Sequence, residues 1–353
     1  MNNKTLPSDS GRTLLLSDDL INKMISLDEA IHLVEAGFAA DGVGSAVALP
    51  VVVQAIDAFD AHFGVKSGYL SASRPASAHS ALLDYLSANV GDVLGLKAGG
   101  YWYKNSELGL PGHRAVLLLL EPNTGSPVAV MSANSITRMR TAAAGAVAAK
   151  YLARRDSQTV GIIGAGDQAH AQLQALSLHR RIRRVYVWAR RPAAAEEYAS
   201  AWKQAGLHVE ISREISPAIE NADIIITATP SKNALVNSDW VRPGTHITAV
   251  GSDGSGKQEL DVRLLQRAKV VVDKAQQSLE IGELQHALKE GLNAGKMIHA
   301  ELGEICAGLK TGRENDEEIT IFDSTGVNFQ DLVVAAYLVR KAKSEGLGEY
   351  VLL

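Results

Sequence analysis

The spacing of apolar side chains in the first part of the chain changes from a helical to an extended pattern. From Leu27 to Phe38 apolar residues recur every three or four positions, which predicts an amphipathic helix. Ser26 precedes this run and Glu29 follows three positions later, the capping-box spacing with which many helices begin. Short β-rich runs then predict strands over residues 49–53, 61–65, 95–97 and 115–120. We therefore expect an α+β domain with a largely antiparallel sheet.

Beyond Arg140 the pattern becomes an alternation of strands and helices. A helix of small residues begins at Thr141, and short β-branched runs follow at residues 159–164, 185–188, 222–229, 246–251 and 270–273. Such alternation predicts a parallel, doubly wound sheet. The tail, a strand at 319–322 and a helix over 331–345, does not continue it. We predict an α/β fold with a Rossmann domain over residues 138–320 and a discontinuous α+β domain made of residues 1–137 and 321–353.

The composition narrows the class of protein. The chain has 353 residues, 46% of them hydrophobic and 21% charged, which is enough to bury a core in each of two domains. A net charge of −4 lacks the basic excess typical of proteins that bind nucleic acid or anionic membranes, so neither partner is expected. The single cysteine, Cys306, excludes an intramolecular disulfide, and the histidines form no compact ligand set, so no metal is expected. The longest solid apolar run, residues 115–120, is far below the about 20 residues that span a bilayer, and no signal peptide is recognised, which predicts a cytoplasmic protein.

A glycine-rich loop follows the first predicted strand of the second domain. Gly164, Gly166 and Ala169 form the pattern G-x-G-x-x-A between a strand and a helix. In dinucleotide-binding proteins the first glycine permits a tight turn, and the second lets the backbone approach the pyrophosphate closely. The small third residue allows the helix to pack closely on the strand. The loop therefore predicts a dinucleotide site, with the helix N-terminus facing the phosphates.

The end of the next strand bears on which dinucleotide is bound. An NAD site usually carries an acidic residue there to hold the ribose 2′-hydroxyl. This chain has Ala189, Arg190 and Arg191 instead. No carboxylate would repel a 2′-phosphate here, and the two arginines are potential partners for it. The sequence favours NADP(H), with NAD(H) possible and a solvated basic turn as the alternative interpretation of the arginines.

Several further motifs, taken in order, resemble one family. They are Gly95-Leu-Lys97, Met139-Arg140-Thr141, Gly164-Ala-Gly166-Asp167-Gln168, the stretch from Val250 to Asp261, and Phe322-Asp-Ser324-Thr325-Gly326. From about residue 14 to its end the chain resembles the ornithine cyclodeaminase/mu-crystallin family. The stretches 95–102, 256–261 and 281–286 are most similar to its iminosuccinate reductase branch. The resemblance implies an NAD(P)-binding Rossmann domain, a second domain for substrate binding and dimerisation, and a homodimer.

The resemblance also implies roles for individual residues. Lys97 would hold the substrate carboxylate or polarise an imine, Asp253 would face the substrate nitrogen, and His113 is a candidate proton donor. The cofactor contacts that the resemblance implies are Arg140, Thr141, Asp167, Gln168, Lys257, Ser324 and Thr325. The family usually has an arginine in an early strand to grip the carboxylate, and here Val53 stands near that place. The candidates to replace it are Lys66, Arg74 and Arg114.

Three functions are compatible with these residues. The first is reduction of a 2-imino acid to an L-amino acid, in which a carboxylate near the nitrogen stabilises a protonated imine that accepts a hydride. The second is cyclodeamination of a diamino acid, with release of ammonia and no net redox change. The third is a non-catalytic NADPH-binding protein, which the presence of both Lys97 and Asp253 disfavours.

Overall fold

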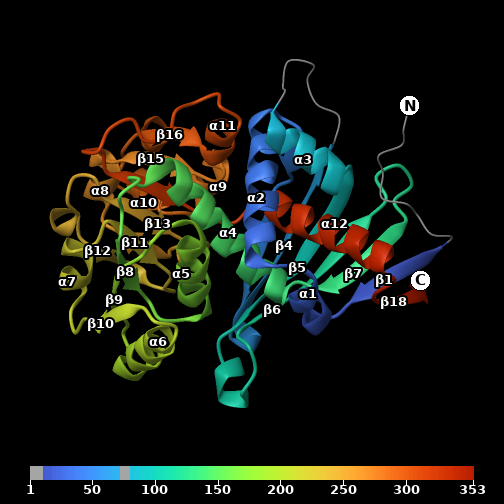
Figure 1. Cartoon of the computed structure of the whole chain (residues 1–353), viewed down its shortest axis with the longest axis horizontal. Coiled ribbons are helices and arrows are strands. Elements are labelled where there is room, and N and C mark those ends of the chain that lie inside the picture. The colour runs from blue at the N-terminus through green and yellow to red at the C-terminus, as the bar shows by residue number, and fades with distance from the viewer. Residues whose placement is uncertain (1–10, 72–79) are drawn as a thin grey trace. The chain divides into compact units, whose positions relative to one another are not determined.

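A computed structural model describes residues 11–71 and 80–353, so the candidate Arg74 lies outside the described residues. The chain divides into two compact units (Figure 1). Unit 1 is Met1–Arg140 with Val327–Leu353, and unit 2 is Thr141–Gly326. The helix α4, Asn134–Leu152, contains the first of these boundaries.

Unit 1 is built on one mixed sheet. Its helices are α1 Asp18–Met24, α2 Leu27–Gly42, α3 Ala81–Asn89 and α12 Asn328–Glu345, and its strands are β1 Arg12–Leu16, β2 Ala46–Ala48, β3 Val52–Ile56, β4 Ala61–Leu70, β5 Val93–Trp102, β6 His113–Leu120, β7 Pro127–Ser132 and β18 Glu349–Leu352. The strand order is β18-β1-β7-β6-β5-β4-β2, with β3 also paired to β4. All pairs are antiparallel except β1 with β7, which confirms the largely antiparallel sheet.

The helix α12 fills the core of unit 1. Its residues from Asn328 to Ala336 are all buried, and Phe329 meets Phe38 of α2 edge to face at 5.3 Å between ring centroids. Gly95 in the middle of β5 lets the helix approach, because a Cβ there would lie 2.9 Å from the side chain of Leu332. The predicted capping box of α2 is confirmed, since Ser26 accepts a hydrogen bond from the backbone of Glu29, whose carboxylate accepts one in return.

Unit 2 is a parallel sheet between two layers of helices. Its helices are α5 Asp167–His179, α6 Pro192–Gln204, α7 Ile215–Glu220, α8 Val262–Arg267, α9 Ala275–Ile281, α10 Leu284–Lys289 and α11 Leu302–Cys306, and its strands are β8 Thr159–Ile163, β9 Arg184–Trp188, β10 His208–Ile211, β11 Ile224–Thr227, β12 Lys232–Val236, β13 His246–Ala249, β14 Gln258–Leu260, β15 Lys269–Val272, β16 Ile298–Glu301 and β17 Thr320–Asp323. The main sheet has the order β10-β9-β8-β11-β13-β17-β15-β16, and β12 pairs with β14 separately. Ile225 faces one apolar core while Ile224 and Ile226 face the other, so the predicted doubly wound sheet is confirmed.

The structure corrects the predicted end of the Rossmann domain. Residues 321–353 were expected to belong to the other domain, but β17 lies inside the parallel sheet between β13 and β15. The chain enters unit 1 only at Val327. The strand was misassigned because its β-branched residues carry no sign of which sheet they join.

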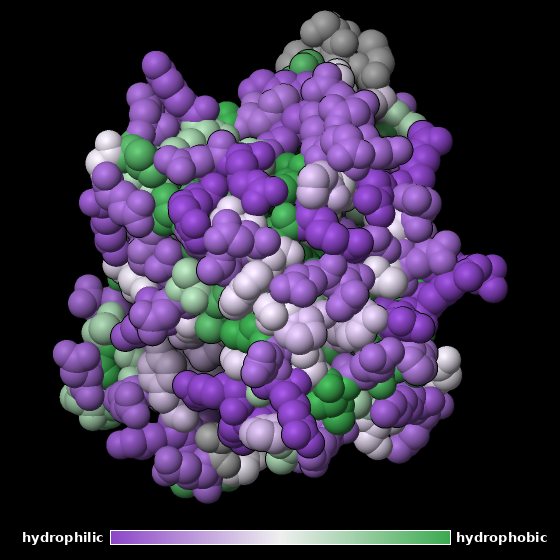
Figure 2. Space-filling view, turned by 90° about the vertical axis from the view of Figure 1, so that its left-hand side faces the viewer, coloured by the Kyte–Doolittle hydropathy of each residue, from purple (hydrophilic) through white to green (hydrophobic). Residues whose placement is uncertain are grey.

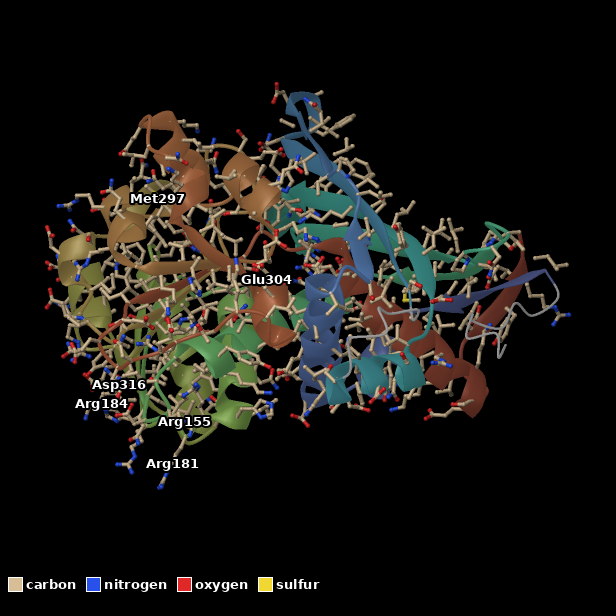
Figure 3. The ribbon with its side chains drawn as sticks, turned by 90° about the horizontal axis from the view of Figure 1, so that it is seen from above. Arg155, Arg181, Arg184, Met297, Glu304 and Asp316 are labelled. Atoms are coloured by element: carbon tan, nitrogen blue, oxygen red, sulfur yellow. The ribbon has the colours of Figure 1, made fainter. Side chains whose placement is uncertain are left out.

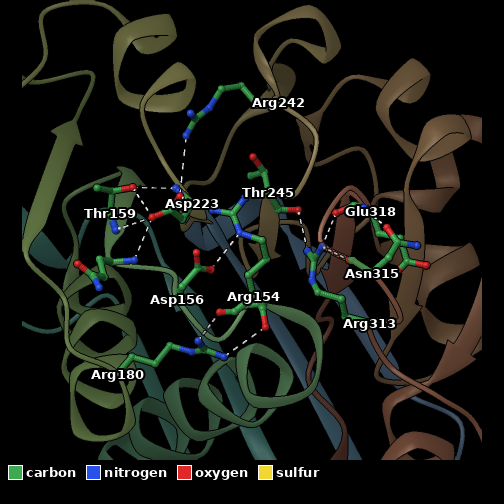
Figure 4. Close-up of polar contacts among 12 residues, drawn as sticks. Arg154, Asp156, Thr159, Arg180, Asp223, Arg242, Thr245, Arg313, Asn315 and Glu318 are labelled. Carbon is green, nitrogen blue, oxygen red and sulfur yellow. Dashed lines mark hydrogen bonds and ion pairs between the residues drawn. The ribbon is translucent and has the colours of Figure 1, made fainter.

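Arginine side chains form hydrogen bonds and ion pairs at the end of the unit 2 sheet where the strands begin (Figure 4). Asp223 accepts hydrogen bonds from the backbone of Gln158 and Thr159 and from Arg154. Arg180 donates to the carbonyls of Ala149 and Arg154, and thereby satisfies the last turn of α4. At the same edge Arg155, Arg181 and Arg184 project outward (Figure 3).

One face of the molecule is mostly polar (Figure 2). The face in Figure 2 is largely hydrophilic, with scattered hydrophobic residues. Within residues 11–71 and 80–353, no helix has the length and apolar character needed to cross a membrane.

Candidate active site

The glycine loop of unit 2 has the geometry of a pyrophosphate site. Gly164 adopts φ of 104°, and a Cβ there would lie 2.6 Å from the carbonyl oxygen of Ala228, so the turn requires glycine. Gly166 caps α5 without a side-chain bond, and a Cβ on it would meet nothing within 4 Å. The N-terminal N–H groups of α5 are therefore open to an anion. Next to them Asp167 is exposed, and Oε1 of Gln168 is buried without a hydrogen-bond partner. These residues fit a dinucleotide.

The strand β9 ends as the sequence indicated, without a carboxylate. Ala189 is half-buried, and Arg190 and Arg191 are exposed directly after the strand. Arg191 is also the N-cap residue of α6, where it makes no capping bond through its side chain. Both guanidinium groups are therefore placed at the position where a Rossmann fold meets the ribose of a bound dinucleotide.

The loop after β13 carries two of the candidate residues. Nζ of Lys257 lies 2.5 Å from Oδ1 of Asp253, an ion pair four positions apart in which the Asp253 side chain is half exposed. The glycines and the lysine of this loop resemble those of a nucleotide phosphate loop (P-loop). A P-loop leads from a strand into a helix, whereas this loop leads into strand β14, so it is not a P-loop.

Ser324 and Thr325 follow β17 and are buried. The carboxylate of Asp273 accepts hydrogen bonds from the Thr325 hydroxyl at 2.7 Å and from the N–H of Gly326 at 2.6 Å. The hydroxyl of Ser324 also donates to Asp273, at 3.3 Å. Asp273 thus fixes this segment, and the nicotinamide contacts implied for it stay a prediction. Thr141, another predicted cofactor contact, accepts a bond from Gln172 through its carbonyl.

Unit 2 also buries carboxylates to which the motifs assigned no role. Burial raises the pKa of Glu259, and burial with the nearby Asp323 and Glu259 raises that of Glu283 well above its usual range. Burial also raises the pKa of Asp323 to about 7, with a contribution from Asp273. These acids accept backbone hydrogen bonds from the loops at the carboxyl ends of the strands, where ligands bind in open α/β sheets.

Unit 1 holds a buried cluster of cations around one carboxylate. Asp331, in the first turn of α12, accepts from Nζ of Lys97 at 2.9 Å and from Nε of Arg140 at 3.2 Å. Lys97 also donates to the hydroxyl of Thr137 at 3.1 Å, and Arg140 to Oε1 of Gln330 at 2.8 Å. The resemblance assigned Arg140 to the cofactor phosphates, whereas in the structure its bonds join it to Lys97 through Asp331.

A third cation lies near this cluster. Lys66 on β4 lies directly opposite Lys97 on β5 in the antiparallel register, and its charge also acts on Asp331. Burial lowers the pKa of Lys97 to about 7, with Arg140 and Lys66 contributing. Burial opposes ionisation of Asp331, but Arg140 and Lys97 outweigh it and lower its pKa. Three cations close together favour an anionic ligand.

Buried polar atoms at the start of α12 point to a ligand in the same place. Oδ1 of Asn328, Nε2 of Gln330 and Oδ2 of Asp331 have no hydrogen-bond partner although they are buried. Buried polar atoms are rarely left unpaired in proteins. The N-cap of α12, Val327, supplies no side-chain bond, so the positive end of the helix dipole adds to the cations.

The other predicted substrate residues lie elsewhere on the sheet. His113 faces Tyr101 in the register and Arg114 faces Gly100, three or four positions from Lys97 along β5. Because side chains alternate between faces, His113 shares the face of Lys97 and the exposed Arg114 points to the opposite one. Of the described candidates to replace the missing arginine, the cluster therefore contains Lys66 and not Arg114. Sequence reasoning missed Asp331 and Gln330, whose partners are 190 or more positions away in the chain.

Comparison with known proteins places these sites in a family context. The model of the ornithine cyclodeaminase/mu-crystallin family matches residues 13–346. The iminosuccinate reductase of Paracoccus denitrificans is 38% identical over 338 residues, which cover 96% of this chain and 99% of that protein.

Solved structures agree in fold along the whole chain. An archaeal alanine dehydrogenase, solved as a dimer with bound NAD, has a TM-score of 0.86 at 38% identity and covers 96% of this chain and 99% of its own. The Δ1-pyrroline-2-carboxylate reductase of Thermococcus litoralis, solved with NADH and L-proline, has a TM-score of 0.87 at 36% identity and covers 96% of this chain and 100% of its own.

Proposed function

The chain belongs to the ornithine cyclodeaminase/mu-crystallin family, and from that premise we propose that it reduces a 2-imino acid to an L-amino acid with a reduced nicotinamide dinucleotide. The observation that carries the proposal is the set of two buried cations, Lys97 and Arg140, and the half-buried Lys66 near the buried carboxylate of Asp331. These three cations attract a carboxylate ligand. The relatives that act on imino and amino acids, named above, support the same class of substrate.

Each proposed role follows from the charge of the residue and from the family resemblance, which assigns Lys97 and Asp253 to one substrate. When bound, the nicotinamide supplies a hydride. Lys97 and Lys66 hold the α-carboxylate, which fixes the orientation of the C=N group. Asp253, whose half-exposed carboxylate is paired with Lys257, stabilises the positive charge of the protonated imine. With a pKa of about 7, Lys97 is also able to give up or accept a proton at neutral pH.

The test is cofactor oxidation with oxaloacetate, pyruvate or cyclic imines in the presence of ammonia or methylamine. Asp253→Asn should lower kcat by about 10²–10³ because it removes one electrostatic contact to the developing charge. Lys97→Ala should mainly weaken binding of the carboxylate. Matched controls are Asp239→Asn and Lys104→Ala, whose side chains are exposed.

Redox balance separates this proposal from cyclodeamination. A reductase consumes one reduced cofactor for each amino acid formed, whereas a cyclodeaminase regenerates it in every cycle. Release of ammonia and formation of proline from ornithine, with only catalytic amounts of oxidised cofactor, would overturn the proposal.

We further propose that NADPH is preferred over NADH, although the two solved relatives named above hold NAD or NADH. The support is the absence of a carboxylate after β9 and the presence of Arg190 and Arg191. Replacing both by alanine should raise the Kd for NADPH at least about tenfold, or ~1.4 kcal/mol, and leave that for NADH nearly unchanged. The double variant Arg155→Ala, Arg181→Ala is the control, and equal affinity of the unmodified protein for both cofactors contradicts the idea.

We propose a homodimer formed through the sheet of unit 1. The face opposite α12 carries apolar side chains that are only half-buried or exposed, among them Phe63, Tyr69, Leu94, Leu96, Val116 and Leu118. A solvated face of an antiparallel sheet is normally polar, so this one suits a second copy of the chain. Val116→Glu should yield monomers in sedimentation at micromolar concentration, whereas the control Leu178→Glu, an exposed site in unit 2, should not.

A further inference from the structure

We propose that the start of α10 is a clamp that positions the Asp253–Lys257 pair, and that Gln285 is its central positioning residue. The clamp consists of Glu283, the N-cap residue of α10, together with Gln285 and His286 in its first turn. The catalytic part of this inference rests on the proposed function, whereas the structural part does not. Sequence similarity singled out the stretch from Ile281 to His286, but none of the roles above uses it.

Gln285 holds the backbone of the loop at several points. Its Oε1 accepts a hydrogen bond from the N–H of Gly256 at 2.7 Å. Its Nε2 donates to the carbonyl of Gly282 at 2.9 Å and to those of Gly254 and Lys257 at 3.3 Å. The side chain is buried, so water does not readily replace these bonds. One amide group therefore ties together the turn that separates Asp253 from Lys257.

His286 adds a bond to the same turn. Its Nε2 lies 2.8 Å from the carbonyl oxygen of Lys257, and because a carbonyl only accepts, the ring nitrogen is the donor. The carbonyl of Lys257 also accepts from the hydroxyl of Ser252 at 2.9 Å. The backbone that carries the Lys257 side chain is thus fixed from α10 and from within the loop.

Glu283 and Glu259 fix the two ends of the loop. The carboxylate of Glu283 accepts from the N–H groups of Glu259 and Leu260 at 2.8 and 3.1 Å, where the loop enters β14. The carboxylate of Glu259 in turn accepts from the N–H of Gly251 at 2.8 Å, where the loop leaves β13. A Cβ on Gly251 would collide with the carbonyl of Thr229, so the backbone reaches this carboxylate only because residue 251 is glycine.

We infer that the clamp keeps the charged side chains of Asp253 and Lys257 in a fixed orientation. Asp253 and Lys257 are partly exposed side chains on a glycine-rich loop, and such a loop samples many conformations unless its backbone is held. An electrostatic catalytic group is effective only when it is preorganised. Loosening the backbone at residues 254–257 should therefore slow turnover without disturbing the pyrophosphate site at Gly164–Gln168, which belongs to other elements of unit 2.

The test compares Gln285→Met, which keeps the length of the side chain and removes its hydrogen bonds, with Gln276→Met. Gln276 is an exposed residue of α9 bonded to Glu280. We expect hydrogen exchange at the backbone of residues 251–260 to accelerate at least about tenfold in Gln285→Met. We expect kcat to fall at least about tenfold while the Kd for NADH, measured by nicotinamide fluorescence, stays within about threefold. The Gln276→Met control should match the unmodified protein in all three.

Gln285→Glu is the second variant, for use if Gln285→Met does not fold. It keeps the shape of the side chain and the oxygen that accepts the hydrogen bond from Gly256. Its new carboxylate would face the carbonyls of Gly254, Lys257 and Gly282, so the loop should again exchange faster. Unchanged exchange of residues 251–260 in a folded Gln285 variant overturns the clamp, as does faster exchange with unchanged kcat. Failure of the unmodified protein to reduce any imine refutes the proposed function instead, and the exchange measurement still tests the clamp.

Discussion

Replacing Asp331 by asparagine tests the electrostatic reasoning about the cation cluster. Asp331 is the buried carboxylate that supports the charge on Lys97, through a 2.9 Å hydrogen bond. A hydrogen bond to a charged group contributes about 1.5–3 kcal/mol, and one pKa unit corresponds to about 1.36 kcal/mol. Asp331→Asn should therefore lower the pKa of Lys97 from about 7 by roughly one to two units.

The consequence is measurable in the binding of a carboxylate that does not react, such as malonate, followed by calorimetry across pH. Protonated Lys97 attracts the carboxylate, so affinity should be high below its pKa and fall as pH rises through about 7. In Asp331→Asn the same fall should occur at a pH roughly one to two units lower. The exposed Asp316→Asn is the control. A midpoint that stays in place or moves upward refutes the assignment of Asp331 as the group that sustains the charge of Lys97.

Three further predictions concern other parts of the molecule. Gly166→Val should leave the thermal midpoint unchanged but raise the Kd for NADH at least about tenfold, because its Cβ meets no protein atom within 4 Å and enters the space proposed for the pyrophosphate. Burial, with Arg313 and Arg180, holds the pKa of His246 well below its usual value. The free energy of unfolding should therefore be highest above about pH 6.5 and decline below it, because the unfolded chain then takes up a proton that the folded chain does not. His246→Gln should flatten this decline in urea titrations at different pH values. Ser26→Ala should lower the free energy of unfolding by about 1 kcal/mol, since it removes the cap of α2, and a loss below about 0.3 kcal/mol in urea would contradict the cap assignment.

The sequence revealed local features well and distant partners poorly. The glycine loop at Gly164 and the capping box at Ser26 depend on residues a few positions apart, so their spacing was sufficient. The partnership of Lys97 with Asp331 spans 234 positions, and no local pattern marks an acid in a helix as the counter-ion of a distant lysine. The strand β10 was missed because it is short, lies at the sheet edge and has one buried residue. Arg140 stands at the junction of the units, where a motif suggests a cofactor contact but gives no information about Asp331.

The placement of α12 has a consequence for synthesis on the ribosome. Unit 1 begins at the N-terminus, but the helix that fills its core comes from the last residues of the chain, after all of unit 2. Domains generally fold as they emerge, so unit 2 is able to complete its sheet while unit 1 still exposes the apolar residues of α2 and β5 that α12 covers. The nascent protein therefore acquires the carboxylate for Lys97 and Arg140 only after all of unit 2 has been made. A translation product truncated before Val327 lacks both α12 and this counter-charge, so it exposes the apolar surface that α12 covers and leaves Lys97 and Arg140 without the carboxylate of Asp331.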